Sequence, residues 1–310
     1  MLEKTKYLNP TNDVSFKKLF GTEEHKPLLI SFLNSILGLE GKRRIKEIEL
    51  LSKDQAPLIR ETKSSVLDIK CTDQRQLQYI VEMQNKTVPG FVKRAQFYAS
   101  HSYITQLPSG SSYVEIKPVI LLAIANYELF GAKERVISYH KTLDIHTLEN
   151  DLQDLSYVFI ELPKFTKNQS ELESLQDKWL YFFANWEETR EIPQSVQEKE
   201  LLEAYRSMEE YNWSIEEREA YIKANIALTD EYDARKKAEE IGIQKGRKEG
   251  REEGRKEGEK IGIQKGREEG EKIAEKRLKS ELAKKMLSVM SKEEVADMMA
   301  WTLSEIEEIE

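Results

Sequence analysis

The fold is decided by "VLDIKCTDQRQLQYIVEMQNK", residues 66–86, where two runs of alternating apolar and polar residues flank a polar centre. Such alternation is typical of half-buried strands, and the polar residues around Arg75 predict a turn between them. We therefore expect a β-hairpin. Its first strand presents Leu67, Ile69 and Cys71 on one face and Asp68 and Lys70 on the other; its second presents Tyr79, Val81 and Met83 opposite Ile80, Glu82 and Gln84.

With the turn centred near Arg75, Asp68 stands across the hairpin from Glu82. Facing side chains of paired strands are about 5 Å apart at Cβ, so two bare carboxylates there repel each other unless a cation lies between them. A divalent metal ion would remove that repulsion. The alternative that these residues alone leave open is a surface hairpin with a solvated polar face.

The flanking sequence indicates an α/β fold. Residues 12–38 have helical apolar spacing, and Asn12 or Asp13 is a suitable N-cap. Alternation typical of strands begins at residue 45, and helical spacing returns over residues 90–107. The runs "VILLAIA" (119–125) and "LSYVFIELPKF" (155–165) have the composition of buried strands, and only helical patterns follow residue 170.

The C-terminal third is of low complexity. "IGIQKGRKEG" at residue 241 recurs as "IGIQKGREEG" at residue 261, with glycine at every fourth position from Gly242 to Gly270. Each interior glycine costs a helix about 1 kcal/mol against alanine, so this helix is expected to be weak in isolation. It is either a close-packing helical oligomerisation element or a flexible charged linker.

Two amphipathic helices are predicted in the tail, with N-caps at Ser291 and Ser304. They suggest a small packing or interaction module, because the acidic tail disfavours phosphate contact. The chain thus divides into an α/β domain with a helical extension (1–232), the glycine-rich repeat or linker (233–279) and a small helical module (280–310).

Composition narrows the class of protein. The 310 residues carry a net charge of −8, which argues mildly against indiscriminate binding to nucleic acid. The single cysteine, the lack of an apolar leader in "MLEKTKYLNP" and the shortness of the longest apolar run predict a cytoplasmic protein with no membrane segment. The four histidines are too scattered to suggest zinc, and no nucleotide-binding glycine motif occurs.

Five segments in order resemble the recombination-promoting nucleases, a transposase family of the PD-(D/E)XK nuclease superfamily: "NDVSFKKLFG", "VLDIKC", "IVEMQ", "FVKRAQFYASHSYITQL" and "KPVILLAIANYELF". The resemblance spans roughly residues 8–165. It implies a restriction-endonuclease-like mixed sheet flanked by helices, and an enzyme that hydrolyses phosphodiester bonds in double-stranded DNA with Mg²⁺ or Mn²⁺. The family is linked to DNA recombination and transposition.

The resemblance also implies roles for residues of the hairpin. Asp68 and Glu82 would ligate the metal ion, with the backbone carbonyl of Met83 as a third ligand. Gln84 stands where the wider superfamily has lysine; it can orient water, but it cannot supply a positive charge to the transition state. Lys70 could replace that charge, or it could be a salt-bridge partner of Glu82.

Further candidates lie on the flanking helices. Asp13 is either a helix cap or an outer metal ligand, and Lys17 either contacts phosphate or pairs with Asp13. Arg94 and Tyr98 are four residues apart, so both could face the scissile phosphate; taken alone, Tyr98 is better explained as a core aromatic with a polar tip. The rival to an active enzyme is a catalytically weak or inactive nuclease fold that binds DNA or protein and assembles through its repeat. We expect a homo-oligomer in either case.

Overall fold

The computed structural model describes residues 6–51, 54–55, 65–107, 110, 112–131 and 133–309. Contacts divide the chain into two compact units, residues 1–229 and 230–310. The first boundary expected from the sequence lies close by, at residue 232, and the separation of the repeat from the tail module stays a prediction. Among the described residues, no helix is both long and apolar enough to cross a membrane.

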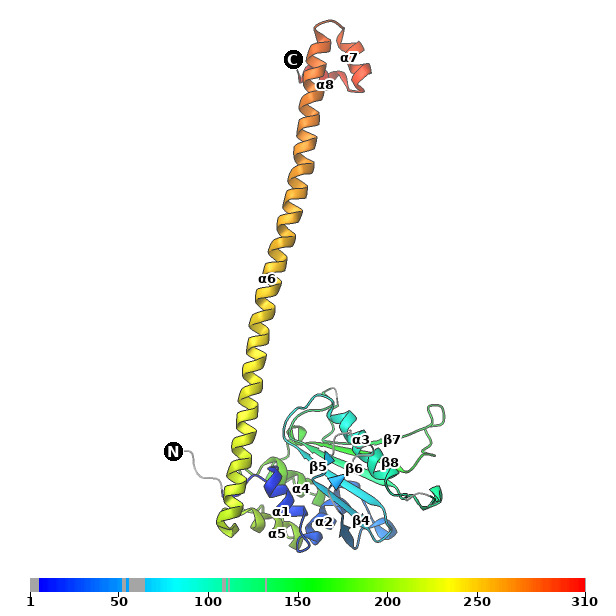
Figure 1. Ribbon diagram of the computed structural model, residues 1–310, viewed down its shortest axis with the longest axis vertical. Coiled ribbons are helices and arrows are strands. Elements are labelled where there is room, and N and C mark those ends of the chain that lie inside the picture. Colours follow the sequence, from blue (N-terminus) through cyan, green and yellow to red (C-terminus); the bar gives the residue numbers. More distant parts are fainter. Residues whose placement is uncertain are drawn as a thin grey trace. The chain divides into compact units, whose positions relative to one another are not determined.

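A mixed six-stranded sheet forms the centre of the first unit (Figure 1). Its strand order is β1-β4-β5-β6-β8-β7; β5, β6 and β8 are parallel, and the other neighbours are antiparallel. The strands are β1 (Ile48–Leu50), β4 (Ile69–Asp73), β5 (Gln78–Gln84), β6 (Val119–Ala125), β7 (Ile137–Lys141) and β8 (Leu155–Glu161), and a separate two-stranded ladder joins β2 (Asp54–Gln55) to β3 (Ser65–Val66). The predicted mixed sheet is confirmed, whereas β7 lies in a stretch that has no clear strand signal.

Helices cover both faces of this sheet, which is why β6 is apolar along its whole length. One face packs against α1 (Asp13–Phe20), α2 (Lys26–Leu37), α4 (Leu175–Ala184) and α5 (Lys199–Met208), and the other against α3 (Phe91–Ile104) (Figure 1). The alternation in β5 follows this division: Tyr79, Val81 and Met83 join the larger core, while Ile80 joins the core under α3. The face of β5 that carries Glu82 is therefore the α3 face.

The hairpin turn is held by Asp73, the last residue of β4. Its carboxylate accepts hydrogen bonds from the backbone N–H groups of Arg75 (2.8 Å) and Leu77 (3.1 Å) and from the Tyr79 hydroxyl (3.0 Å). It also forms an ion pair with Arg75 at 2.5 Å. These contacts fix the turn at residues 74–76, as predicted, and with it the register of β4 against β5.

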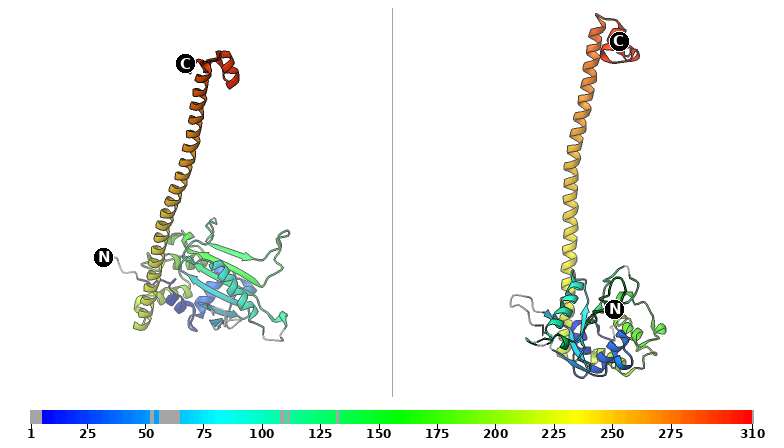
Figure 2. Two further views of the ribbon diagram at one scale, coloured as in Figure 1. Left: turned by 45° about the horizontal axis from the view of Figure 1, so that its top comes forward. Right: turned by 90° about the vertical axis from the view of Figure 1, so that its right-hand side faces the viewer.

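The helix α6 (Ile215–Leu287) is continuous over 73 residues (Figure 2). Its first turns belong to the first unit: Asn225 accepts a hydrogen bond from the side chain of Asn12 (2.7 Å), and Glu217 forms an ion pair with Lys18 (2.5 Å). Beyond residue 230, ion pairs at i and i+4, such as Arg267 with Glu271 (2.9 Å), support the helix. The repeat glycines lie within this helix, exposed to solvent.

A small core closes the end of the chain. Ala283 of α6 packs with Val295 of α7 (Lys292–Met299) and Ile306 of α8 (Leu303–Glu307). Ser291 caps α7 as predicted and forms a capping box with Glu294. The predicted cap at Ser304 is wrong: Thr302 caps α8, because its hydroxyl accepts from the backbone N–H of Glu305 while the Glu305 carboxylate returns to the N–H of Thr302.

Candidate active site

The open end of the hairpin brings Asp68 and Glu82 together. Ile69 pairs with Val81 in the ladder, so the next position outward sets Asp68 against Glu82. The backbone N–H of Asp68 donates to Oε1 of Glu82 (3.3 Å), and the backbone N–H of Met83 donates to Oδ2 of Asp68 (2.9 Å). The predicted opposition of the two side chains is confirmed, and each carboxylate is tied to the other strand.

A bend at Asp68 makes this geometry possible. Residues 67–68 lie outside both β3 and β4, so the strand predicted to run through them is interrupted. The expectation that Leu67 shares a face with Ile69 and Cys71 is therefore wrong: Leu67 packs in the core under α3, and the other two pack in the larger core. Because the ladder stops at Ile69, the backbone N–H groups of Asp68 and Met83 donate to side-chain carboxylates instead of to backbone carbonyls.

Glu82 lies in an environment that penalises its charge. Its side chain is buried, with the residue only 7% exposed. Burial, and next the nearby charge of Asp68, raise the pKa of Glu82 to about 8, although Arg94 and Lys17 oppose this rise. Without a bound cation, the buried Glu82 therefore holds its proton to a higher pH than an exposed glutamate does.

The backbone of Met83 also faces this site. In a strand, the N–H and C=O of one residue point toward the same neighbouring strand. Since the N–H of Met83 donates to Asp68, its carbonyl oxygen is directed to the same side of β5. The Met83 carbonyl, which was predicted as a third metal ligand, thus points to the side of β5 on which Asp68 lies.

Gln84 is bound to α3. One Nη of Arg94 donates to its Oε1, and its own amide donates to the carbonyl of Lys86 (3.1 Å). The guanidinium of Arg94 lies over the rings of Phe91 (5.2 Å to the centroid) and Tyr98 (5.9 Å). Arg94 and Tyr98 therefore share one face of α3, as their spacing predicted, and both lie close enough to Glu82 to interact with it electrostatically. Their contact with a scissile phosphate stays a prediction.

The three other predicted site residues, Lys17, Lys70 and Asp13, differ in burial and in their relation to Glu82. Lys17 on α1 is half-buried, and its charge reaches Glu82. Lys70 is half-buried, and burial lowers the pKa of its ammonium group; it forms no ion pair with Glu82 in the part of the chain that the structure describes. Asp13 is exposed at the first residue of α1, where Asn12, not Asp13, caps the helix.

The oxygen atoms at the hairpin match the ligands that Mg²⁺ and Mn²⁺ prefer. Two facing carboxylates, one of them buried with a raised pKa, are an arrangement that a divalent cation would stabilise. No group of three His, Cys, Asp or Glu side chains suited to a metal occurs among the described residues. A metal ion at this site would therefore take its other ligands from the Met83 carbonyl, water or substrate.

Sequence reasoning missed two residues near this hairpin. Asp73 determines the register that aligns the carboxylates, and the signal for it was an Asp at the start of a turn. Tyr127 is the second residue after β6; its neighbour Asn126 donates its backbone N–H to the Gln84 carbonyl (2.9 Å), and the charge of Arg94 acts on the Tyr127 hydroxyl. No spacing in the sequence connects residue 127 with residue 84.

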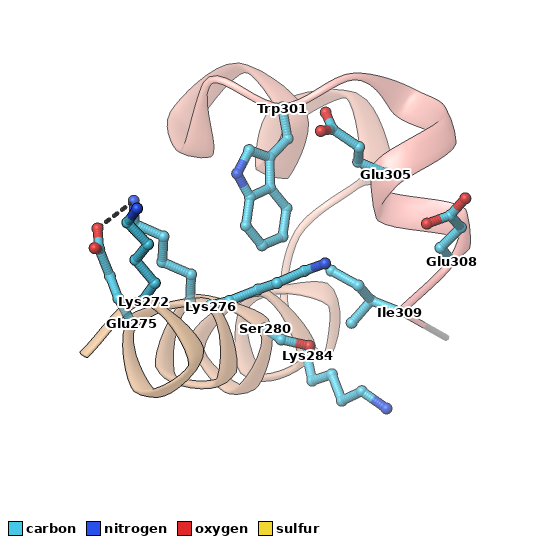
Figure 3. A pocket seen from close by; sticks show the side chains of 10 residues that line it. Lys272, Glu275, Lys276, Ser280, Lys284, Trp301, Glu305, Glu308 and Ile309 are labelled. Atoms are coloured by element: carbon cyan, nitrogen blue, oxygen red, sulfur yellow. Dashed lines mark ion pairs between the residues drawn. The ribbon is translucent and has the colours of Figure 1, made fainter. Parts of the chain in front are cut away.

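A separate hollow of about 620 Å³ lies in the C-terminal unit, between the end of α6 and α8 (Figure 3). Lysines of α6 line one wall, and the indole of Trp301 points into the space from the other side. Acidic groups balance these lysines: Glu275 is paired with Lys279 (2.8 Å), and Glu305 and Glu308 lie opposite. The hollow contains no counterpart of the facing carboxylates at the hairpin.

Comparison with known proteins agrees with this geometry. The family model described as PD-(D/E)XK nuclease family transposase matches residues 10–238, which include the whole sheet and its flanking helices. No curated protein and no solved structure matches the chain significantly. The match covers well over half of the sequence, and the chain belongs to the PD-(D/E)XK nuclease family of transposases.

Proposed function

We propose that this protein is a metal-dependent DNA endonuclease that hydrolyses phosphodiester bonds at the open end of the β4–β5 hairpin. The observation that carries the proposal is the facing pair of Asp68 and Glu82, in which a buried glutamate has its pKa raised to about 8 by burial and by its neighbour. Family membership supports a nuclease acting on DNA. The metal ion, the endonuclease mode and the residue roles below are parts of the proposal.

Asp68, Glu82 and the Met83 carbonyl would hold one Mg²⁺ or Mn²⁺ ion. Bound there, the ion would supply Lewis-acid activation of water and would neutralise charge that develops on the phosphate. The hydrogen bond from Met83 to Asp68 and that from Asp68 to Glu82 hold both carboxylates in position before substrate arrives. Gln84 would orient the attacking water through its amide group.

The DNA backbone would be bound by the basic and aromatic groups around this pair. Lys17 and Arg94 bring positive charge close enough to act on Glu82, and Tyr98 stacks under Arg94. Lys70 is the least favourable candidate for a phosphate contact because burial lowers the pKa of its ammonium group. Asp13 would serve at most as an outer ligand, through water, from the start of α1.

A plasmid nicking assay with Mg²⁺, Mn²⁺ or EDTA tests the proposal. Glu82→Gln keeps the shape of the side chain and an oxygen that can accept from Asp68, but it removes the charge; we expect it to abolish metal-dependent nicking. Glu49→Gln is the matched control, since Glu49 lies on β1 of the same sheet and is exposed. Unchanged nicking by a folded Glu82→Gln variant would contradict the assignment.

A second candidate function follows from Gln84, which lacks the positive charge of the usual lysine. A nuclease fold with weak or no catalysis could act as a DNA- or protein-binding module that assembles through its glycine-rich repeat. Calorimetric titration with Mn²⁺ together with the nicking assay separates the two functions. Binding of metal and DNA by the full-length protein without any cleavage would favour the binding module.

The expected homo-oligomer belongs to this proposal as well. Light scattering of the full chain, compared with a variant that lacks residues 233–310, measures whether the repeat and tail assemble copies of the protein. A fall in mass to that of a single shortened chain supports assembly through this region. An unchanged subunit count would contradict it.

A further inference from the structure

Two polar groups near Gln84 are buried with a donor hydrogen left unpaired. Nε of Arg94 has no acceptor within the described ranges of the chain, and the Tyr127 hydroxyl, whose oxygen the Val88 backbone amide approaches, has none for its hydrogen. Buried donors in folded proteins are almost always paired, and leaving one unpaired is costly. Two such groups next to a proposed active site therefore indicate an acceptor that the protein itself does not supply.

Arg94 is held in a fixed position. One Nη donates to Gln84, and the planar guanidinium lies over the rings of Phe91 and Tyr98. This leaves the Nε–H edge of the group buried and unpaired. A guanidinium presents its donors in a rigid fork that fits the oxygens of a phosphate group.

Tyr127 is a neighbour of this guanidinium. It follows the end of β6, where the N–H of Asn126 donates to the carbonyl of Gln84 (2.9 Å). Burial raises the pKa of Tyr127, while the Val88 backbone amide and the charge of Arg94 oppose the rise. The hydroxyl is therefore protonated at neutral pH and can donate its hydrogen.

We propose that Arg94 and Tyr127 form a binding site for a non-bridging oxygen of a DNA phosphodiester, and that Arg94 supplies the positive charge that Gln84 lacks. This inference rests on the proposed function. One anionic oxygen would accept from both unpaired groups. Gln84 then acts as a positioning residue, since its side chain anchors the guanidinium beside the carboxylates.

The proposal favours Arg94 over Lys70 as the substitute for the superfamily's lysine. The charge of Arg94 opposes the raised pKa of Glu82, so the guanidinium is near the carboxylate pair. Arginine stays protonated under all relevant conditions, whereas burial lowers the pKa of Lys70. Arg94 is also fixed by Gln84 at the position where the missing charge is needed.

The test uses two measurements on the full-length protein. Anisotropy of a short fluorescein-labelled DNA duplex in EDTA reports binding without metal or cleavage, and plasmid nicking with Mn²⁺ reports catalysis. We expect Arg94→Gln to weaken binding by about tenfold and nicking by about 10²–10³-fold. Tyr127→Phe, which removes only the unpaired hydroxyl, should weaken both about fivefold. Lys93→Gln, an exposed neighbour on α3, is the control and should change binding by less than about threefold.

Moving the positive charge from residue 94 to residue 84 is the strictest test of whether Arg94 replaces the missing lysine. In the double variant Arg94→Gln with Gln84→Lys, a lysine replaces the charge, and we expect nicking to recover at least about tenfold over Arg94→Gln alone. If Arg94→Gln misfolds, Arg94→Lys and Tyr127→Phe still decide the matter. Wild-type binding and nicking in both of these variants would overturn the inference.

The same data distinguish this inference from the proposed function. If the wild-type protein never nicks DNA, the endonuclease proposal fails, and loss of duplex binding in Arg94→Gln and Tyr127→Phe still supports the phosphate site. If the wild-type protein nicks DNA and all these variants behave as Lys93→Gln does, the endonuclease proposal stands and the phosphate site is wrong.

Discussion

The two ends of the β4–β5 hairpin surround a buried acidic side chain with different groups. At the turn, Asp73 is 2% exposed, and an arginine, a tyrosine hydroxyl and two backbone N–H groups surround its carboxylate. At the open end, Glu82 is 7% exposed and faces a second carboxylate. Burial is similar, but within the described part of the chain Glu82 is bonded to one backbone N–H and has a like charge beside it.

This difference shows which of the two buried carboxylates stabilises the fold. A carboxylate whose oxygens are bonded to a cation and several donors stabilises the local fold. A carboxylate whose charge is opposed by burial and by a like charge is unfavourable unless a further cation is present. Asp73 therefore holds the register, and the pair at the other end is suited to binding a metal ion.

The largest expected effect is on catalysis. We expect Asp68→Asn to reduce metal-dependent nicking by about 10³-fold or more, because it removes a charge from the proposed metal site. The amide oxygen of asparagine can still accept from the N–H of Met83, so the hairpin should stay folded. Nicking rates and circular dichroism of the purified variant check both statements. Full activity in a folded variant would contradict the role proposed for the carboxylate pair at the open end of the hairpin.

At the turn, the expected effect is on stability. Asp73→Asn should lower the free energy of unfolding by about 2 kcal/mol, because the buried carboxylate loses its ion pair with the partly exposed Arg75. Nicking per folded molecule should be unchanged. Urea unfolding followed by fluorescence measures the loss, with the exposed Asp151→Asn as control. A variant that loses nicking at wild-type stability would show that Asp73 belongs to the chemistry.

The raised pKa of Glu82 predicts a smaller effect that depends on pH. Between its ordinary value of 4.5 and the folded value of about 8, the metal-free folded protein holds a proton that the unfolded chain has lost. The unfolded state thus binds fewer protons, so the free energy of unfolding should fall as pH rises through this window. Asp68→Asn removes the like charge and should be more stable than wild type at pH 9 by on the order of 1 kcal/mol.

Unfolding of both proteins in EDTA across pH 5–9 measures this difference. Arg94 and Lys17, the positive groups that face Glu82, are the same in both proteins. Parallel stability curves for wild type and Asp68→Asn would show that the two carboxylates do not interact.

The smallest effect concerns the repeat. An added Cβ at Gly254 would meet nothing within 4 Å, so Gly254→Ala should stabilise α6 by about 1 kcal/mol without any clash. Hydrogen exchange along α6 measures this gain. Slower exchange is expected; faster exchange would mean that this glycine allows another helix to approach closely, which would sharpen the expectation of a homo-oligomer.

Local patterns in the sequence predicted the elements whose burial is regular. The alternation of residues 66–86 and the position of Arg75 were enough to set Asp68 opposite Glu82, because a hairpin register follows from its turn. The uninterrupted apolar run of β6 predicted a strand covered on both faces. The spacing of Arg94 and Tyr98 placed both on one face of α3.

What the sequence could not predict depends on contacts between distant segments. β7 is an edge strand with a mixed pattern, and its pairing with β8 defines it. The bend that moved Leu67 to the other core arises because side chains at Asp68 and Glu82 replace ladder bonds. Tyr127 reaches Gln84 only because β6 lies parallel to β5.

The most direct test of the central claim is calorimetric titration of the protein with Mn²⁺ at pH 7 in two buffers of different ionisation enthalpy. Because burial and the neighbouring Asp68 raise the pKa of Glu82 to about 8, a metal ion that binds between the two carboxylates at pH 7 should displace a proton. We predict one Mn²⁺ per chain, release of close to one proton, and loss of both signals in Glu82→Gln. Mn²⁺ binding that releases no proton and persists in Glu82→Gln would contradict the account.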